Sequence, residues 1–259
     1  MPALARPELV ALRTIVRKEI RRFLRIWVQT LLPPAITMTL YLVIFGRLIG
    51  SRIGEMGGHD YIDYIAPGVI MMAVITNSYS NVVSSFYGAR FQRYVEEMLV
   101  SPTPIGVVLL GYVAGGVTRG LLVGLLVTLV AMVFADLRVE SPLYTVAVVV
   151  LTSTLFSTAG FINALFARTF DDVSIVPTFV LTPLTYLGGV FFSVELLAEP
   201  WQSLARANPV LYMVNGFRHG MLGVSDIGPG VALALTGGAA VALLVLALLL
   251  LHRGVGIRS

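Results

Sequence analysis

Six long apolar segments, separated by short polar breaks, fill nearly all of this 259-residue chain and constrain its fold more than any other feature. A helix needs about 20 consecutive apolar residues to cross the hydrocarbon core of a bilayer. Sustained runs of this kind have no place in a soluble domain of this size. The sequence therefore predicts an all-α polytopic membrane protein, in which six transmembrane helices cover residues 27–48, 65–87, 105–134, 143–166, 175–192 and 231–251.

The distribution of basic residues predicts the orientation of these helices. Twelve of the 18 Lys and Arg residues fall on one side of the six predicted spans, five fall on the other, and Arg119 lies within the third span. Because an excess of Lys and Arg marks the cytoplasmic side, we expect both termini in the cytoplasm. This placement also accounts for the net charge of +4 without a nucleic-acid partner.

Residues 1–25 precede the first span and are expected to form a cytoplasmic amphipathic helix. Arg13, Arg17, Arg21 and Arg25 recur four apart on one face. The opposite face is apolar at helical spacing and comprises Leu9, Leu12, Val16, Ile20, Phe23 and Trp27. Such a helix lies in the membrane interface and binds anionic lipid, and a contact with a cytoplasmic partner is compatible with that position.

The second span carries a polar stripe formed by Asn77, Asn81, Ser84 and Gly88 at helical spacing. In lipid, such side chains face a neighbouring helix or a water-lined path. Interhelical packing is the favoured interpretation of this stripe, and a translocation path is the alternative.

The third span combines small residues with one charge. Glycines four residues apart, at 111 and 115, 116 and 120, and 120 and 124, permit close approach of another helix. Arg119 lies near mid-span and has no acidic neighbour on its own helix. An intramembrane charge of this kind indicates either a functional site or a structural pair with another helix, and both interpretations stay open.

The loop after the second span predicts a short amphipathic helix over residues 90–101, which Pro102 and Pro104 end. Its acidic pair, Glu96 and Glu97, is unusual on a side otherwise dominated by basic charge. A helix of this form with a sharp stop indicates a docking element for a partner.

Residues 194–223, between the last two predicted spans, are too interrupted to cross the membrane and too apolar for a free loop. Asn208-Pro209 divides this segment, because the residue before a proline avoids the helical region and a proline suits the first turn of the next helix. We therefore expect a re-entrant hairpin of two short helices in the outer leaflet.

The chain lacks the residues of the common catalytic and metal sites. Its only lysine, Lys18, follows Arg17, so no phosphate-binding GxxxxGK[ST] loop is possible, and the chain contains no cysteine. Its three histidines are far apart in sequence and have no metal-binding spacing. We expect no catalytic residue, cofactor or metal in this chain.

Three segments resemble the permease subunits of ABC-2-type (type V) ATP-binding-cassette exporters, and the resemblance covers the whole chain. EEMLVSPTP (96–104) is similar to the coupling-helix region of that family. FDDVSIVPTFVLTPLTYLGGVFF (170–192) and NPVLYMVNGFR (208–218) resemble its carboxy-terminal signature.

The resemblance implies a homodimer of this chain in a bacterial cytoplasmic (inner) membrane, with two ATPase subunits that hold ATP and Mg on the cytoplasmic side. It assigns ATPase coupling to Arg90, Arg93, Tyr94, Glu96, Glu97, Met98 and Leu99. It assigns an extracytoplasmic gate to Gly188, Gly189, Phe191, Phe192, Leu197, Trp201, Asn208, Pro209 and Arg218. Asn77, Asn81 and Tyr186 are candidates for the translocation path of an amphipathic or lipid-linked substrate.

Other classes of membrane protein fit the sequence less well. A secondary transporter needs carboxylates within its spans, and no Asp or Glu falls inside the six predicted ones. A channel needs a filter or a duplicated pore motif, and the single Asn208-Pro209 is not one. A structural subunit of an envelope complex, without a transport path of its own, remains the alternative.

Overall fold

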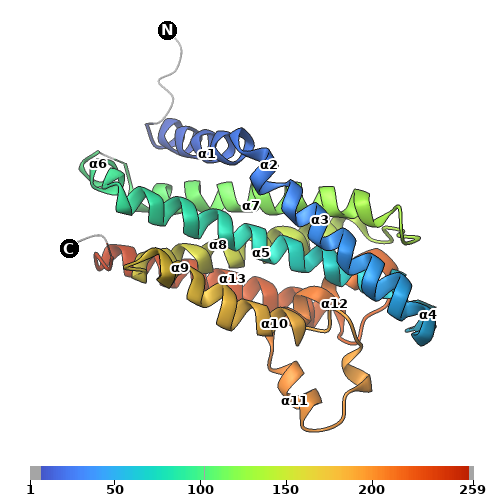
Figure 1. Cartoon of the computed structure of the whole chain (residues 1–259). Coiled ribbons are helices and arrows are strands. Elements are labelled where there is room, and N and C mark those ends of the chain that lie inside the picture. Colours follow the sequence, from blue (N-terminus) through green and yellow to red (C-terminus); the bar gives the residue numbers. More distant parts are fainter. Residues whose placement is uncertain (1–6, 102, 257–259) are drawn as a thin grey trace.

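The computed structural model of the protein describes residues 7–101 and 103–256, apart from the side chain of Leu99. It is a bundle of helices packed side by side around α5 (Tyr61–Phe91). Helix α5 contacts α7 (Ile105–Ala131) and α8 (Pro142–Phe166), and α8 also packs against α13 (Pro229–His252) (Figure 1). Most residues of α5 are buried, which makes it the central helix of the bundle.

The first apolar segment forms a bent helical run from Trp27 to Ile53. It consists of α2 (Trp27–Thr30), α3 (Leu32–Tyr41), the π-helix η1 (Leu42–Ile49) and α4 (Gly50–Ile53). The break between α2 and α3 falls at Leu31, two positions before Pro33-Pro34, so the early kink predicted from this proline pair is confirmed.

Within the described residues, five helices are long and apolar enough to cross a membrane: Trp27–Ile53, α5, α7, α8 and α13. Residues 175–186 of the predicted span at 175–192 instead belong to a shorter helical run, which covers residues 170–186. This run comprises α9 (Phe170–Val176), the π-helix η2 (Pro177–Leu181) and α10 (Thr182–Tyr186). The helical prediction for 187–192 was wrong, because the chain turns in this segment. Gly189 has a positive φ of 71°, a conformation that glycine adopts easily and that is common just after a helix.

A two-stranded hairpin that the sequence analysis missed joins the first helical run to α5. Strand β1 (Glu55–Met56) pairs antiparallel with β2 (His59–Asp60). Gly57 and Gly58 both have positive φ, at 61° and 79°, as a tight two-residue turn requires. The Gly57-Gly58 dipeptide was the available signal.

The loop helix after α5 is shorter than expected. Helix α5 continues through Arg90 to Phe91, and a turn at Arg93, in the left-handed region with φ of 61°, separates it from α6 (Tyr94–Val100). The expected helix over 90–101 is thus the end of α5 followed by α6. Pro102 lies outside the described residues.

The segment between α10 and α13 contains two helices of unequal burial. After the 3₁₀ turn η3 (Val194–Leu196), α11 (Trp201–Arg206) projects from the bundle, whereas α12 (Pro209–Leu222) packs against α5, α8 and α13 (Figure 1). The Asn208 side chain accepts a hydrogen bond of 2.9 Å from the Val210 amide, which caps α12. The predicted break at Asn208-Pro209 is therefore confirmed.

The glycines of α7 bring neighbouring helices close to its backbone. A Cβ atom at Gly111 would lie 2.5 Å from Ile15, and one at Gly115 would lie 2.6 Å from Glu19, both in α1 (Pro7–Arg25). On another side of α7, a Cβ at Gly124 would lie 2.8 Å from Val74 of α5. The predicted role of these glycines in close helix packing is confirmed.

Gly160 of α8 allows a close contact that a larger residue would disrupt. An alanine Cβ there would lie 2.6 Å from the carbonyl oxygen of Tyr79, which belongs to the α5 backbone and has little freedom to move. We predict that Gly160→Ala destabilises the protein by about 1–3 kcal/mol, as overpacking does. Thermal melting of the purified protein in detergent measures this loss.

Gly238 provides a matched control, because it also lies within a membrane helix and nothing is found within 4 Å of an added Cβ. Gly238→Ala should leave the melting temperature unchanged or raise it. Equal melting temperatures for the two variants would contradict the packing argument.

Candidate functional site

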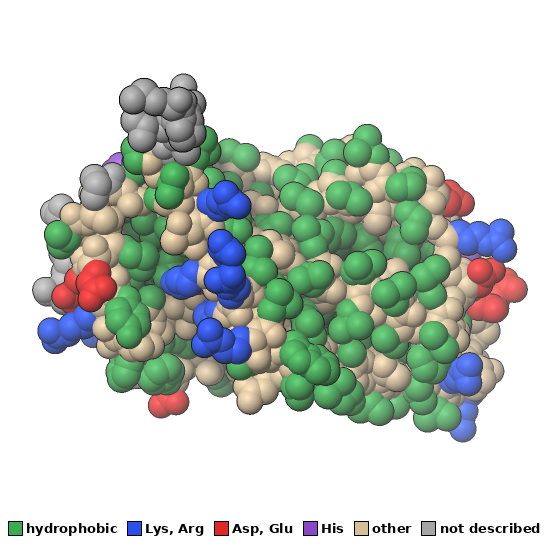
Figure 2. Space-filling model, turned by 90° about the horizontal axis from the view of Figure 1, so that it is seen from above, with side chains coloured by type: hydrophobic (Ala, Val, Ile, Leu, Met, Phe, Trp, Pro, Cys, Tyr) green, Lys and Arg blue, Asp and Glu red, His purple; other side chains and the backbone are tan. Residues whose placement is uncertain are grey.

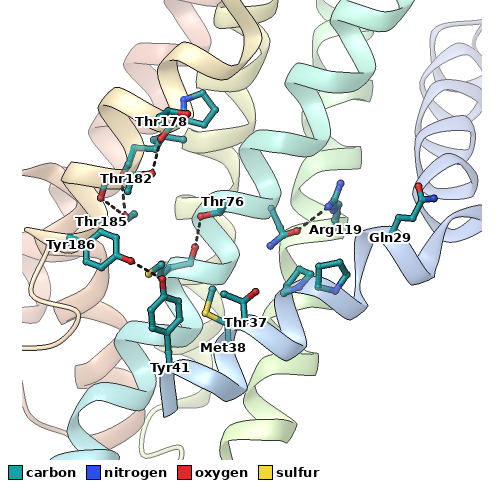
Figure 3. A pocket seen from close by; sticks show the side chains of 16 residues that line it. Gln29, Thr37, Met38, Tyr41, Thr76, Arg119, Thr178, Thr182, Thr185 and Tyr186 are labelled. Atoms are coloured by element: carbon teal, nitrogen blue, oxygen red, sulfur yellow. Dashed lines mark hydrogen bonds between the residues drawn. The ribbon is translucent and has the colours of Figure 1, made fainter. Parts of the chain in front are cut away.

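A hollow of about 530 Å³ lies between α3, α5 and the helical run over residues 170–186 (Figure 3). Its polar lining consists mostly of hydroxyl groups, from Thr37, Tyr41, Thr76, Thr178, Thr182, Thr185 and Tyr186. Its apolar lining includes Met38, Met72, Leu181 and prolines from both flanking helical runs. A mixed lining of this kind suits an amphipathic molecule more than a purely apolar one.

Arg119 of α7 lies at one side of this hollow. Its Nη2 donates to Asn77 Oδ1 at 3.0 Å and to the carbonyl oxygen of Thr30 at 3.3 Å (Figure 3). The side chain is thus partnered by neutral groups of two other helices and also lines the cavity. Both interpretations of the intramembrane charge have a structural basis, since Arg119 is paired and also accessible to a ligand.

Aromatic side chains form the other side of the hollow. The hydroxyl oxygens of Tyr41 and Tyr186 lie 2.6 Å apart and form a hydrogen bond that joins α3 to α10. The Phe191 ring packs on Tyr41 and Tyr186, with ring centroids 5.7 and 5.9 Å away, and on Phe45 at 4.5 Å. This cluster brings Tyr186, a predicted path residue, together with Phe191, a predicted gate residue.

Helix α5 carries a second polar row, one position before Asn77, Asn81 and Ser85, and the first residue of this row, Thr76, lines the hollow. Thr76 and Ser84 are exposed and Ser80 is half-buried, although all three belong to a membrane-spanning helix. The hydroxyls of Thr76 and Ser84 donate to carbonyl oxygens four residues earlier, at 2.9 and 2.7 Å. The face of α5 that carries Thr76, Ser80 and Ser84 is therefore polar, and no other helix in the described part of the same copy covers it fully.

A buried carboxylate that the sequence analysis missed connects α1 to α5. Glu19 has no exposed surface. Its Oε1 accepts from Ser85 Oγ at 2.8 Å and lies 3.2 Å from Lys18 Nζ, and its Oε2 lies 3.4 Å from Arg22 Nε. Arg22 Nη2 also donates to Asn81 Oδ1 at 2.8 Å. Asn81, predicted as a path or packing residue, thus serves interhelical packing.

Lys18 completes this network on α1. Burial disfavours its charged form, but Tyr112 and Glu19 more than offset this effect, so the pKa of Lys18 is raised. The ammonium donates to the Tyr112 hydroxyl at 3.1 Å. The α1–α7 contact therefore carries a charged, hydrogen-bonded side chain next to the close glycine packing.

The predicted coupling residues divide between internal and exposed positions. The Arg90 guanidinium donates to carbonyl oxygens at the end of α8, at 2.9 Å for Leu165 and 3.2 Å for Ala167, and so supports the bundle. Met98 is half-buried, and the side chain of Leu99 lies outside the described residues. The exposed members of the set are Arg93, Tyr94, Glu96 and Glu97.

A basic groove lies between α1 and the α5–α6 turn. Gln92 and Tyr94 form one wall, and the other consists of Arg13, Arg17, Lys18, Arg21, Arg22 and Arg25 of α1. Figure 2 shows a row of Lys and Arg side chains that runs across the long axis of the molecule near one end, whereas hydrophobic side chains cover much of the remaining face. The predicted basic face of α1 is therefore exposed beside α6.

The face of α1 that contacts the bundle differs from the predicted apolar stripe. The buried residues of α1 are Ile15, Glu19 and Phe23, of which only Phe23 belongs to that stripe. The exposed fraction of Leu9 is 59%. Leu12, Val16 and Ile20 of the stripe are only half-buried, so the face centred on Ile15, Glu19 and Phe23 makes the closest contacts with the bundle.

Arg218 of α12 joins the two halves of the chain at the other end of the bundle. It is fully buried, and its guanidinium lies over the Tyr64 ring at 4.0 Å. Its Nη2 donates to the Gly189 carbonyl at 2.7 Å, and its Nε donates to the Tyr64 carbonyl at 3.1 Å. This predicted gate residue therefore clamps the Gly188-Gly189 turn to the start of α5.

The other predicted gate residues occupy different environments. A Cβ at Gly188 would lie 2.7 Å from Val210, so this glycine is closely packed. Phe192 and Leu197 pack against a small cluster that includes buried Leu211. Trp201 on α11 is 59% exposed and contributes to none of these contacts.

Across residues 7–101 and 103–256, no group of His, Cys, Asp or Glu is arranged to hold a metal ion. The hollow is lined by groups that form hydrogen bonds and apolar contacts, and it lacks a nucleophile–base pair of the kind that covalent catalysis uses.

Comparison with known proteins places this architecture among membrane transporters. A family model described as ABC-2 type transporter matches residues 10–222. The inner membrane transport permease YadH of Escherichia coli (strain K12) is 57% identical over 254 residues, which covers 96% of this chain and 98% of the relative. Nodulation protein J of Rhizobium leguminosarum bv. trifolii is 29% identical over 185 residues, or 71% of each chain. The family match runs from α1 to the end of α12 and includes the hollow, α6 and Arg218.

The network around Glu19 yields a direct test of its structural role. Replacement by alanine removes the acceptor of Ser85 and the carboxylate beside Lys18 and Arg22. We predict that Glu19→Ala destabilises the protein by about 1–3 kcal/mol, the cost of leaving buried polar groups unpaired. A thermal melt in detergent reports this change, and proteolysis of α1 should become faster.

Glu8 in the first turn of the same helix is exposed and makes a suitable control. Glu8→Ala should melt like the unmodified protein. If Glu19→Ala also does so, the buried carboxylate contributes nothing to holding α1 in place.

Proposed function

Because the chain belongs to the ABC-2 type transporter family, we propose that it is the permease subunit of an ATP-binding-cassette exporter, powered by a separate ATPase. The coarser assignment follows from the family and the apolar helices: the chain is a multi-pass transporter subunit of a bacterial inner membrane. The finer steps of the proposal concern the path, the dimer and the coupling to ATP hydrolysis.

The uncovered polar face of α5 is the observation that carries this proposal. In one copy, Thr76 and Ser84 of the hydroxyl row are exposed and Ser80 is half-buried, and Thr76 lines the hollow. Polar side chains within a membrane helix face a protein partner or a water-lined path rather than lipid. A second copy placed against this face would close two facing hollows into one route, so we propose a homodimer with its path between the two α5 helices.

We propose six crossings with both termini in the cytoplasm. The end of α13 and α6 lie at the same end of the bundle as the start of α1 (Figure 1), which fits an even number of crossings. In this arrangement the helical run over 170–186 is the fifth crossing, and Leu187 to Phe192 complete it as a turn. The basic face of α1 then lies in the cytoplasmic interface, where anionic lipid attracts it.

ATP hydrolysis would reach the path through α6. Two ATPase subunits, each with its ATP and Mg, would bind the cytoplasmic end of the dimer, with Arg93, Tyr94, Glu96 and Glu97 at the contact. These side chains are exposed at the end of α5, the helix that lines the hollow. A push on α6 would therefore act on the same helix that forms the path.

The segment 194–223 would close the path on the opposite side of the membrane. Its helix α12 is held by Arg218 to the start of α5, and α11 projects outward with Trp201 exposed. The apolar surface of α11 is available for a contact with the second copy. This contact, next to the aromatic cluster of Tyr186 and Phe191, would form the extracytoplasmic gate.

The coupling assignment predicts that reversal of one acidic charge on α6 uncouples the complex. Glu97→Lys should weaken ATPase assembly by about 2–5 kcal/mol if the carboxylate becomes buried at the contact. Co-purification with the ATPase and its hydrolysis rate in reconstituted vesicles measure this effect.

Glu55→Lys makes the same charge reversal on the exposed hairpin that precedes α5, at the other end of that helix, and should leave assembly and hydrolysis unchanged. Normal assembly and normal coupling in Glu97→Lys would refute the role given to α6. ATPase binding without any effect of this chain on hydrolysis would favour a structural subunit over an exporter.

The gate assignment can be tested with single cysteines, because the chain has none of its own. Cysteine at Trp201 or Leu204, both exposed on α11, should crosslink the two copies in the resting dimer. Crosslinking should stop export while ATP binding continues, since the exit is locked but the ATPase is not. Export at the full rate after complete crosslinking would make the segment an external brace instead of a gate.

A further inference from the structure

The hollow contains one positive charge and no negative charge of its own. Arg119 is the only charged side chain among its described lining residues. The buried carboxylate of Glu19 on α1, which contacts α5 at Ser85, is already engaged by Lys18, Arg22 and Ser85. The charge of Arg119 is therefore balanced by dipoles alone.

The hydrogen bonds of Arg119 also leave donors available. Within the described part of the chain, both of its hydrogen bonds come from Nη2, and its buried Nε has no partner. A guanidinium offers five N–H donors in a planar fork that matches carboxylate and phosphate oxygens. A cation in a low-dielectric site with unused donors favours an anionic ligand.

The remaining lining indicates what the anion is attached to. Threonine and tyrosine hydroxyls stand opposite Arg119 (Figure 3), and Met38, Met72 and Leu181 add apolar surface to the lining. A volume of about 530 Å³ accommodates a headgroup-sized molecule and not a large polymer. The lining thus matches an anionic group joined to an apolar chain.

We propose that this hollow binds the anionic headgroup of an amphipathic substrate, a phosphate ester or a free carboxylate on a lipid-like molecule, with Arg119 as the anion contact. This inference rests on the proposed function and specifies its substrate class. In the dimer, two such sites would face the common path, one from each copy.

Binding of dodecyl phosphate to the purified full-length chain, in nanodiscs of phosphatidylcholine and without ATPase, tests the proposal. Equilibrium dialysis with the labelled probe gives the affinity. Arg119→Gln should weaken binding at least about tenfold, since a charge-assisted hydrogen bond is lost, whereas Arg119→Lys should retain most of it. Arg17→Gln is the matched control, because it removes an exposed cation from α1, outside the hollow, and should leave the affinity unchanged.

Two further measurements keep the test decisive if Arg119→Gln folds poorly. Thr182→Phe fills the hollow without changing its charge and should also weaken dodecyl phosphate binding. Competition should be strong with unlabelled dodecyl phosphate and weak with inorganic phosphate or dodecyltrimethylammonium.

Three results would overturn the proposal: full affinity in well-folded Arg119→Gln, an equal loss in Arg17→Gln, or equal competition by the cationic amphiphile. Equal competition by inorganic phosphate would show a free-anion site and overturn the assignment to an amphiphile. The assay involves neither ATPase nor transport, so its failure leaves the coupling prediction at Glu97 intact, and failure of coupling leaves this measurement unaffected.

Discussion

The cost of leaving a polar or charged group unpaired in a membrane is the constraint on which this structure depends. Helix α5 carries two polar rows on adjacent faces, and other helices supply hydrogen-bond partners for one of them. Asn77 and Asn81 accept hydrogen bonds from Arg119 and Arg22, and Ser85 donates to Glu19 one turn further. This row fixes α1 and α7 against α5, and Asn77 lines the hollow together with Thr76 of the neighbouring row.

The two ends of α5 connect the other parts of the molecule. At one end, Arg218 ties the start of α5 to the Gly189 turn through backbone carbonyls. At the other end, Arg90 holds the end of α8, and α6 follows after a short turn. Because α5 is one continuous helix between these two anchors, the proposed coupling between a cytoplasmic partner and an outer gate would act through a single element.

Sequence periodicity and length predicted most of the fold, and local chemistry predicted several of its contacts. The boundaries of α8 and α13 agree with the apolar runs within a few residues, and the helix start at Pro209 follows from proline chemistry. Glu19 was missed because charge was searched for within the spans, although it lies four residues from both Ile15 and Phe23 on the buried face. Nothing in the sequence indicated the contacts that Arg90 makes, because its carbonyl partners at the end of α8 lie 75 and 77 positions away in the chain. The hollow itself was unpredictable, because it depends on how three separate helical runs are spaced.

The Arg218 clamp also bears on how the protein is made. Arg218 and the carbonyl of Tyr64 to which it donates are 154 positions apart in the chain. Chains fold from the N-terminus as they emerge from the ribosome, so α5 is made long before its first turn has this partner. In the proposed orientation, the start of α5 and its hairpin would lie beyond the membrane, exposed to lipid headgroups and water, until α12 has been synthesised and delivered to the same side. A defect in α12 would therefore leave a nascent protein with its central helix inserted but its outer end unfinished, which is the kind of intermediate that membrane quality-control proteases remove.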